Sequence, residues 1–384
     1  MHRILKIGLD VHSTNYTICI KEVHWKQDDK IWLNEKIDAD YLEIVKLVKK
    51  VTEKIGGNND DFDIECGYEA GCLGYTLYHD LTNAGLKCTI LAPTTMLVQK
   101  GVRIKTDKRD ARLIADCLAS GGYHPVYVPS EDDEDVKEFI RMRDDHKALL
   151  KGMKQRIKAF CLRHNKQYQG NSNWTKAYIE WLWKLELSRL ERETLNEYLQ
   201  TLSELMAKIE KFDKRIHELS QQKAYATAVK KLACFLGIKT VTALALIVEI
   251  GDYDRFAKAE QFASFLGLVP GERSSNESIA RLGITKAGNT HLRRLLIEAA
   301  QSMSRGKIGY KSAELRRRQE GNTPEVVAYA DKANVRLRSK YYRLLAKGKA
   351  RNTIIAAVAR ELACFVWGMM TDHIALSAQC PAHA

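Results

Sequence analysis

Four carboxylates in the first 110 residues carry the strongest chemical signal in this sequence: Asp10, Glu69, Asp107 and Asp110. Asp10 lies within an apolar run that predicts a buried strand, where a charge is costly unless it is paired or binds a metal. Glu69 ends a second strand-like run. Asp107 and Asp110 open a predicted helix, and their spacing of three places both on one helical face. Such oxygen-rich sets suit Mg²⁺ or Mn²⁺, and two such ions can drive phosphodiester chemistry.

Two neighbouring residues qualify this set. Glu65 precedes Glu69 on what reads as the same strand, so it is the alternative second acid. His12 follows Asp10 by two positions and therefore faces the same side of its strand. A surface or supporting position is the expectation for His12, with contact to the metal site as the alternative.

The segments that must position these carboxylates alternate between strand-like and helix-like patterns. Three strand-like segments and one helix-like segment are followed by the order strand, helix, strand, helix, which predicts an α/β fold with a mixed sheet. The predicted strands cover residues 5–11, 16–23, 31–37, a run ending at 69, and 88–91; the predicted helices cover 40–55, about 73–84, and 107 to about 120.

Residues 131–222 change character, because glycine and proline nearly vanish and apolar residues recur at spacings of three and four. This pattern predicts two long helices joined near 169–174, which we expect to pair as an antiparallel hairpin. Charged outer faces favour a coiled-coil arm or dimerisation element. Pairing within one chain and pairing between two chains both fit the pattern.

A third region begins at about residue 226, which suggests domains at 1–128, 129–225 and 226–384. The segment 236–243 lies between apolar helical stretches and resembles a helix-hairpin-helix turn, whose backbone N–H groups bind phosphate. An ordinary corner between two helices is the alternative. A polar loop at 271–277 and a further helix from about 290 follow.

The charge distribution favours a nucleic-acid partner. The net charge is +13 over 384 residues. Residues 1–130 hold 17 basic and 18 acidic residues, whereas residues 305–351 hold 14 basic and 4 acidic residues. Such a local excess favours a phosphate-binding surface, although a solvated charged helix also fits.

The nine cysteines do not form a disulfide framework, because their number is odd and no Cys-x-x-Cys pair occurs. Buried free thiols in a reducing cytosol fit this usage. No zinc-ligand spacing, signal-peptide core or apolar run of about 18 residues is evident. The expectation is a cytoplasmic protein with no membrane partner.

Four segments, in order, resemble the insertion-sequence transposases with a DEDD motif: Tyr68–Gly71, Val102–Ala111, Gly267–Pro270 and Ile284–Arg293. The resemblance spans nearly the whole chain. It implies a RuvC-like (RNase H-like) N-terminal domain, joined by a long helical coiled coil to a helical C-terminal transposase domain.

The resemblance also implies site residues. Asp10, Glu69, Asp107 and Asp110 map to the catalytic, metal-binding carboxylates, with Mg²⁺ or Mn²⁺ as the ion. The loop after Gly267–Pro270 carries the catalytic serine, which we assign to Ser275, with Ser274 as the alternative because Asn276 stands where the family usually has glycine. The residues expected to contact nucleic acid are Arg273, Lys286 and Arg293 near that loop, and Arg316, Arg317 and Arg318 in the basic tract.

The function implied is a transposase and site-specific recombinase that cuts and rejoins donor and target DNA through a covalent phosphoserine. Its implied partners are a structured guide (bridge) RNA from the element and further copies of the chain, as a dimer or tetramer with a composite site. The implied location is the cytoplasm of a bacterial or archaeal cell, at the nucleoid when active. The alternatives are a RuvC-like nuclease that hydrolyses DNA, and a non-catalytic nucleic-acid-binding protein.

Overall fold

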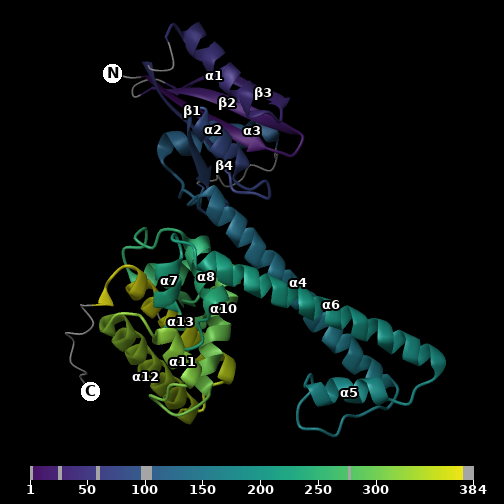
Figure 1. The fold of residues 1–384 in the computed structure, drawn as a ribbon. Coiled ribbons are helices and arrows are strands. Elements are labelled where there is room, and N and C mark those ends of the chain that lie inside the picture. Colours follow the sequence, from purple (N-terminus) through teal and green to yellow (C-terminus); the bar gives the residue numbers. More distant parts are fainter. Residues whose placement is uncertain (1–2, 25–27, 58–60, 97–105, 276–277, 375–384) are drawn as a thin grey trace. The chain divides into compact units, whose positions relative to one another are not determined.

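The protein is described here from a computed structural model (Figure 1) that covers residues 3–24, 28–57, 61–96, 106–275 and 278–374. The chain divides into two compact units, Met1–Val128 and Pro129–Ala384. We call them the N-terminal unit and the C-terminal unit and describe each by itself.

A five-stranded mixed sheet forms the centre of the N-terminal unit, with the strand order β3-β2-β1-β4-β5. Strands β1, β2 and β3 pair antiparallel, whereas β4 and β5 continue the sheet in parallel with β1. The predicted α/β class with a mixed sheet is confirmed. The strands are β1 Arg3–Val11, β2 Asn15–Val23, β3 Lys30–Asp38, β4 Phe62–Glu69 and β5 Lys87–Leu91.

Helices cover both faces of this sheet. Side chains alternate along a strand, so Ile7, Leu9 and Tyr68 join the apolar core with α1 (Tyr41–Ile55) and α2 (Thr76–Asn83). Helix α3 (Asp107–Ser120) packs on β1, β2 and β4. Gly8 packs against this helix and alternates with Ile7 and Leu9 along β1, so α3 lies on the face opposite to that core.

Gly8 allows α3 to lie directly on β1. A Cβ atom at this position would overlap the backbone carbonyl oxygen of Ala111 and the backbone nitrogen of Ala115. Any larger residue would therefore push α3 off the sheet. Because Asp10 lies two residues beyond Gly8 on β1, this close approach brings the start of α3 toward Asp10.

Two long helices, α4 (Glu131–Arg163) and α6 (Arg189–Ser220), run antiparallel at the start of the C-terminal unit. Apolar residues such as Ile157 on α4 and Leu199 on α6 bury one another. The connection contains a further short helix, α5 (Lys176–Lys184), which the sequence pattern did not predict.

The rest of the C-terminal unit is a helical bundle that carries one β-hairpin. The first turns of α4 and the last turns of α6 contribute Val136, Ile140 and Ile216 to the core of this bundle. The helical region 129–225 and the region 226–384 therefore share one compact unit. The bundle contains α7 Ala226–Leu232, α8 Thr240–Ile250, α9 Ala259–Phe265, α10 Thr290–Ala300, α11 Ala313–Gln319, α12 Pro324–Ala346, α13 Arg351–Met370 and the strands β6 Pro270–Ser275 and β7 Ser278–Ile284.

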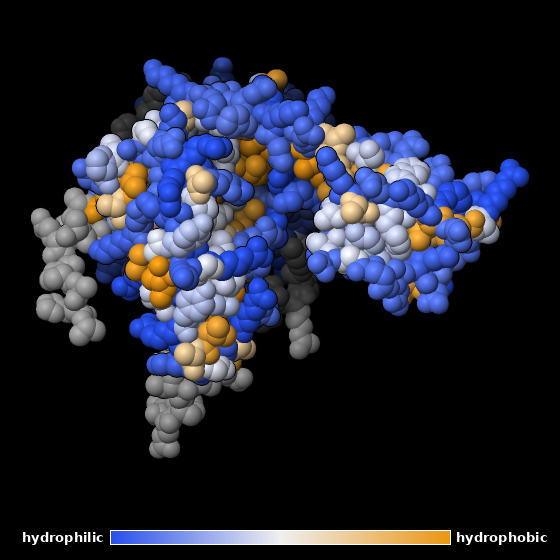
Figure 2. Space-filling view, turned by 60° about the horizontal axis from the view of Figure 1, so that its bottom comes forward, coloured by the Kyte–Doolittle hydropathy of each residue, from blue (hydrophilic) through white to orange (hydrophobic). Residues whose placement is uncertain are grey.

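Helix α13 is the central helix of this bundle. It is long and apolar enough to cross a membrane by length and composition alone. However, it packs against α7, α9, α10 and α12, and residues such as Val358 and Leu362 are fully buried. Figure 2 shows mostly hydrophilic residues on the visible surface, with hydrophobic residues exposed in separate small groups. The apolar composition of α13 is thus explained by its place in the core.

Candidate active site

Asp10, His12 and Asp107 meet beside the end of β1. Their ligand atoms all lie within 4.8 Å of one another, close enough to share a metal ion. The His12 Nε2 atom is 3.4 Å from Asp10 Oδ2. Asp10 is half-buried, whereas His12 and Asp107 are exposed. The structure therefore brings together two of the predicted carboxylates. It places His12 beside them as an exposed residue in contact with Asp10, which agrees with the surface or supporting position expected for it.

Asp110 adds negative charge to the same place from the first turn of α3. Burial raises the pKa of the Asp10 carboxyl, and the charges of Asp110 and Asp107 raise it further, although His12 acts in the opposite direction. Carboxylates that crowd one another in this way favour a bound cation. Asp110 itself lies outside the group of ligand atoms that fall within 4.8 Å.

The register of β1 and β4 bears on the choice between Glu69 and Glu65. The paired strands end with Leu9 opposite Tyr68, and Asp10 and Glu69 are the next residues along these parallel neighbours. Glu69 therefore shares with Asp10 both the sheet edge and the sheet face. It is exposed and lies outside the 4.8 Å group.

Glu65 lies further back on β4 and has other partners. Its carboxylate accepts hydrogen bonds from Lys6 Nζ at 2.6 Å and Thr89 Oγ1 at 3.1 Å, and Lys87 Nζ lies 3.4 Å away. Burial acts to raise the pKa of Glu65, but the Lys6 hydrogen bond and the two lysine charges lower it overall. These contacts give Glu65 a structural role, which favours Glu69 as the second acid.

The β6–β7 hairpin carries the predicted serine at its tip. Position 274 pairs with 279, and position 275 pairs with 278. The side chains of residues 273–281 lie outside the described part of the structure. The roles expected for Arg273, Ser274 and Ser275 therefore remain predictions.

Tight backbone packing supports the base of this hairpin. Gly267 and Gly288 have φ values of 65° and 75°, and a Cβ atom on either would overlap a backbone oxygen of the other's loop. Both positions require glycine for conformation and for space. Lys286, which has a φ of 58°, is exposed beside them.

Arg293 requires a correction, because we expected it to contact nucleic acid. It is 9% exposed, and its Nη1 donates to the carbonyl oxygens of Leu266 and Ala287, at 3.0 Å each. The guanidinium thus fastens the two glycine loops together. A sequence motif cannot show whether an arginine donates to backbone carbonyls or faces solvent, since that depends on how the loops pack.

Comparisons with known proteins match these same regions. A DEDD transposase family matches residues 7–164, and the family described as "Transposase IS116/IS110/IS902 family" matches residues 229–315. A putative transposase of Sinorhizobium fredii is 32% identical over 368 residues, covering 95% of this chain and 88% of the relative. The chain belongs to the IS110/IS116/IS902 family of insertion-sequence transposases.

Two further relatives extend this result. The transposase of the insertion sequence element IS1533 from Leptospira borgpetersenii is 31% identical, over 91% of this chain and 99% of the relative. A pilin gene-inverting protein of Moraxella bovis is 27% identical, over 60% of this chain and 63% of the relative. The two family matches contain the DEDD carboxylates and the serine hairpin of this transposase.

A basic groove of about 1040 Å³ lies beneath the hairpin of the transposase. Leu282 and Ile284 from the hairpin form part of its wall. Its cations are Lys286, Lys340, Arg351 and Arg360, and none of the residues that line it is Asp or Glu. Of the four, Lys340 pairs with Glu361 at 2.6 Å. A groove with this charge suits a phosphate backbone.

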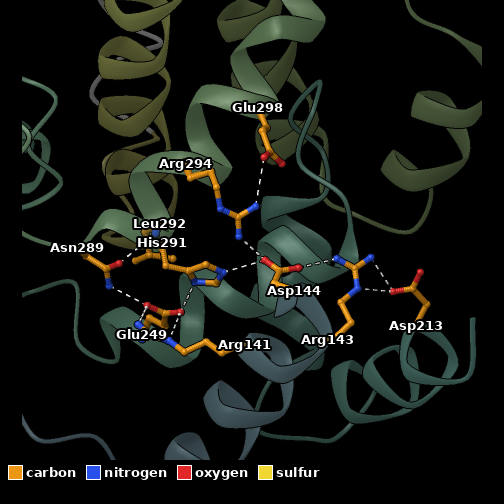
Figure 3. A network of polar contacts seen from close by, with 10 residues as sticks. All are labelled: Arg141, Arg143, Asp144, Asp213, Glu249, Asn289, His291, Leu292, Arg294 and Glu298. Carbon is orange, nitrogen blue, oxygen red and sulfur yellow. Dashed lines mark hydrogen bonds and ion pairs between the residues drawn. The ribbon is translucent and has the colours of Figure 1, made fainter. Parts of the chain in front are cut away.

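A buried polar network joins four helices of the C-terminal unit (Figure 3). At its centre, the His291 ring of α10 contacts Asp144 of α4, at 3.0 Å, and Glu249 of α8. Asn289 caps α10, accepting from Leu292 N at 3.0 Å, and also donates to Glu249 at 2.8 Å. The network ties the helix that follows the hairpin to the base of the long helices.

Every charge in this network has a partner of opposite sign. Arg141 donates to Glu249, and Arg143 and Arg294 donate to Asp144. Burial opposes ionisation, but hydrogen bonds from His291 and the arginines outweigh it. They lower the pKa of Glu249 to about 2 and hold that of Asp144 well below its usual value. The two carboxylates in return raise the pKa of His291 to about 8, against burial.

The arginines of the basic tract differ in exposure. Arg316 and Arg317 on α11 are exposed. Arg318 requires a correction, because its Nη1 donates to the carbonyl oxygens of Ala233, at 3.1 Å, and Ile238. The guanidinium therefore closes the turn between α7 and α8, which gives this half-buried arginine a structural role.

That turn is the segment that resembled a helix-hairpin-helix. Gly237 has a φ of 91° and packs so closely on the carbonyl of Ala299 that a Cβ would overlap it. Gln319 Nε2 also donates to Cys234 O at 3.2 Å. These contacts are those of an ordinary corner inside the bundle.

Proposed function

We propose that this transposase cuts and rejoins DNA through a covalent phosphoserine intermediate, with a divalent metal at its DEDD carboxylates. The observation that carries the proposal is the meeting of Asp10 and Asp107, from distant parts of the chain, beside one sheet edge. Crowded carboxylates are unfavourable without a cation, and the raised pKa of Asp10 reflects this crowding together with burial. The pilin gene-inverting relative adds support, because inverting a gene requires strands to be rejoined as well as cut.

The residues that would hold the metal are Asp10, Glu69, Asp107 and Asp110, with His12 in contact with Asp10. When bound, Mg²⁺ or Mn²⁺ would polarise the scissile phosphate and stabilise negative charge in the transition state. His12 is placed to orient the Asp10 carboxylate. Gly8 keeps the start of α3 close enough to β1 for the two acids to act together.

Ser275 is the nucleophile that we propose, with Ser274 as the alternative. Its Oγ would form a bond to phosphorus while the bond from phosphorus to the leaving DNA oxygen breaks, and the hydroxyl proton would pass to a base. The ester conserves the energy of the phosphodiester. A strand end can then attack it, release the serine and reseal DNA without ATP.

The basic groove beneath the hairpin supports a nucleic-acid path, with Lys286 and Arg360 among its exposed cations. The guide RNA, the dimeric or tetrameric assembly with a composite site, and the cytoplasmic location come from the family resemblance and form part of the same proposal. In an RNA-guided system, base pairing reads the sequence while the protein binds shape and backbone.

The decisive experiment combines the purified chain, the RNA encoded beside its gene, labelled element-end and target DNA, and Mg²⁺. A denaturing gel detects DNA that is covalently shifted by protein. We expect a shifted band with the wild type and with Ser264→Ala, an exposed serine of α9 that serves as control. Ser275→Ala should lose the band.

The two hairpin serines can be distinguished because successive positions on a strand alternate between its faces. Loss of the band only with Ser274→Ala would move the nucleophile by one position. Cleaved DNA with no adduct in any sample would instead establish hydrolysis by the carboxylates alone, the chemistry of a RuvC-like nuclease.

A further inference from the structure

The outer half of α4 carries a stripe of lysines that the proposed chemistry does not use. Residues 146–163 hold six basic residues and no acidic one. Lys147, Lys151, Lys154 and Lys158 are spaced by four, three and four, which places them on one helical face. The neighbouring helix α6 mixes both signs of charge along its whole length. The stripe is therefore a local feature of α4.

These four lysines are not neutralised within the chain. None of them forms an ion pair with a carboxylate in the part of the chain that the structure describes. Lys147, Lys151 and Lys158 are exposed, and together the four cations line a depression of about 330 Å³ that contains no Asp or Glu. The positive charges of such a surface repel one another, and an anionic partner would relieve this repulsion.

An aromatic ring forms the other side of this depression. Trp174 is half-buried there, and the Lys154 ammonium lies 5.3 Å from the centre of its ring. Tyr178 supports the ring edge-on, with the two ring centres 5.0 Å apart. The ring is thus held in one orientation beside the cations.

The backbone of Trp174 is in an unusual conformation. Its φ is 66°, a value that a bulky side chain rarely adopts. The other non-glycine residues of the described chain with a positive φ are Asn165, Lys286 and Asp372, all of them polar. Because such strain persists only where the surroundings impose it, it often marks a functional position.

We propose that this face of α4 binds an unpaired DNA strand, with phosphates along the lysine stripe and a base stacked on Trp174. Positively charged tracks beside an aromatic platform are typical of single-strand binding. From Lys147 to Lys158 the helix rises about 16 Å, which matches two to three phosphates of one strand. The inference rests on the proposed function, since strand exchange is what exposes unpaired DNA.

The test measures binding of a labelled 20-nucleotide DNA strand to the full chain by fluorescence anisotropy over a range of salt concentrations. The stripe variant is Lys147→Gln/Lys151→Gln/Lys158→Gln, which changes exposed residues only. The matched control is Lys208→Gln/Lys211→Gln/Lys214→Gln, which removes the same charge from exposed positions of α6.

The stripe variant should bind about tenfold more weakly, and its salt slope should fall by about two because three phosphate contacts are lost. The control should bind as the wild type does. Trp174→Leu keeps an apolar side chain but removes the stacking surface, so it should also cost about tenfold in affinity. Equal binding by the stripe variant, or equal losses in stripe and control, would overturn the proposal.

Two further nucleic acids, a DNA duplex and an RNA strand, distinguish the proposed partner from the alternatives. Duplex DNA should be less sensitive than the single strand to Trp174→Leu. RNA of the same sequence that depends on the stripe more strongly than DNA would assign the face to RNA and overturn the proposal as stated. The readout is independent of the serine chemistry: strand binding that needs the stripe, without any covalent adduct, would retain this inference and reject the phosphoserine.

Discussion

The two units of the transposase contain carboxylate clusters with opposite electrostatics. In the N-terminal unit, burial together with Asp107 and Asp110 raises the pKa of Asp10. In the C-terminal unit, His291 and Arg141 outweigh burial and lower the pKa of Glu249 to about 2. The residue types are the same, and the difference lies in what surrounds them. Carboxylates that are paired with cations stabilise a fold, whereas carboxylates that lie beside one another favour the binding of a cation.

The largest effect that we predict tests the crowded cluster. Asp10→Asn should lower DNA cleavage at least about a hundredfold, because the neutral amide weakens metal binding where charge must be stabilised. Cleavage of labelled element-end DNA with Mg²⁺ measures this loss. Asp63→Asn, an exposed position near the opposite end of β4, is the control. Unchanged cleavage in Asp10→Asn would remove the carboxylates from the mechanism.

The stability of Asp10→Asn provides a second test of the difference between the two clusters. Neutralising Asp10 relieves repulsion with its neighbours, so the melting temperature should stay the same or rise. Glu249→Gln should instead destabilise the protein by about 3 kcal/mol, because it removes one of the two carboxylates that pair with the largely buried His291 cation. The side chain of Glu249 is 2% exposed. Urea unfolding measures the change.

The matched control for Glu249→Gln is Glu298→Gln, at the exposed edge of the same network (Figure 3). Its partner Arg294 lies 3.2 Å away, and both side chains are largely exposed. Such surface pairs contribute less than about 1 kcal/mol. If the two variants unfold at the same urea concentration, the buried part of the network does not stabilise the fold more than its exposed edge does.

The fold of the N-terminal unit was predictable because its signals are local. The apolar pattern of each segment predicts its own strand or helix. Asp107 and Asp110 both lie on α3, as their spacing predicted. The choice between Glu69 and Glu65 needed the pairing of β4 with β1 and the contact with Lys6. Sequence spacing alone contains neither of these facts.

The C-terminal unit shows what local patterns cannot predict. The sequence did not predict the polar network, because Asp144 and His291 are 147 positions apart and meet only through packing. Arg293 is buried and Arg318 is half-buried, and each donates to backbone carbonyls of other segments. Family motifs therefore located the right segments, but did not show which of their cations face outward.

The network also predicts a dependence of stability on pH. The pKa of His291 is about 8 in the folded protein, above the ordinary value of about 6.5. Its contribution is therefore complete below about pH 6.5 and is lost as pH rises through 8. Between pH 6 and pH 9 the free energy of unfolding should fall by about 2 kcal/mol.

Urea unfolding at the two pH values, with His291→Gln beside the wild type, checks this dependence. Glu249 does not contribute in this window, since its lowered pKa moves its titration to acid. The variant should show a much flatter profile, although it is less stable at pH 6. An identical slope in both proteins would place the titrating group elsewhere.

The smallest effect concerns the basic tract, where exposed and half-buried cations are adjacent on α11. Arg316→Gln/Arg317→Gln should leave the melting temperature unchanged and lower the salt slope of DNA binding by about 2, since two phosphate contacts disappear. Arg318→Gln should do the opposite. It should leave the slope intact and cost about 2 kcal/mol of stability, because two carbonyl groups lose a charged donor. A salt slope that responds to Arg318→Gln alone would mean that this arginine leaves its turn to bind phosphate, and that burial in the bundle does not separate binding cations from structural ones.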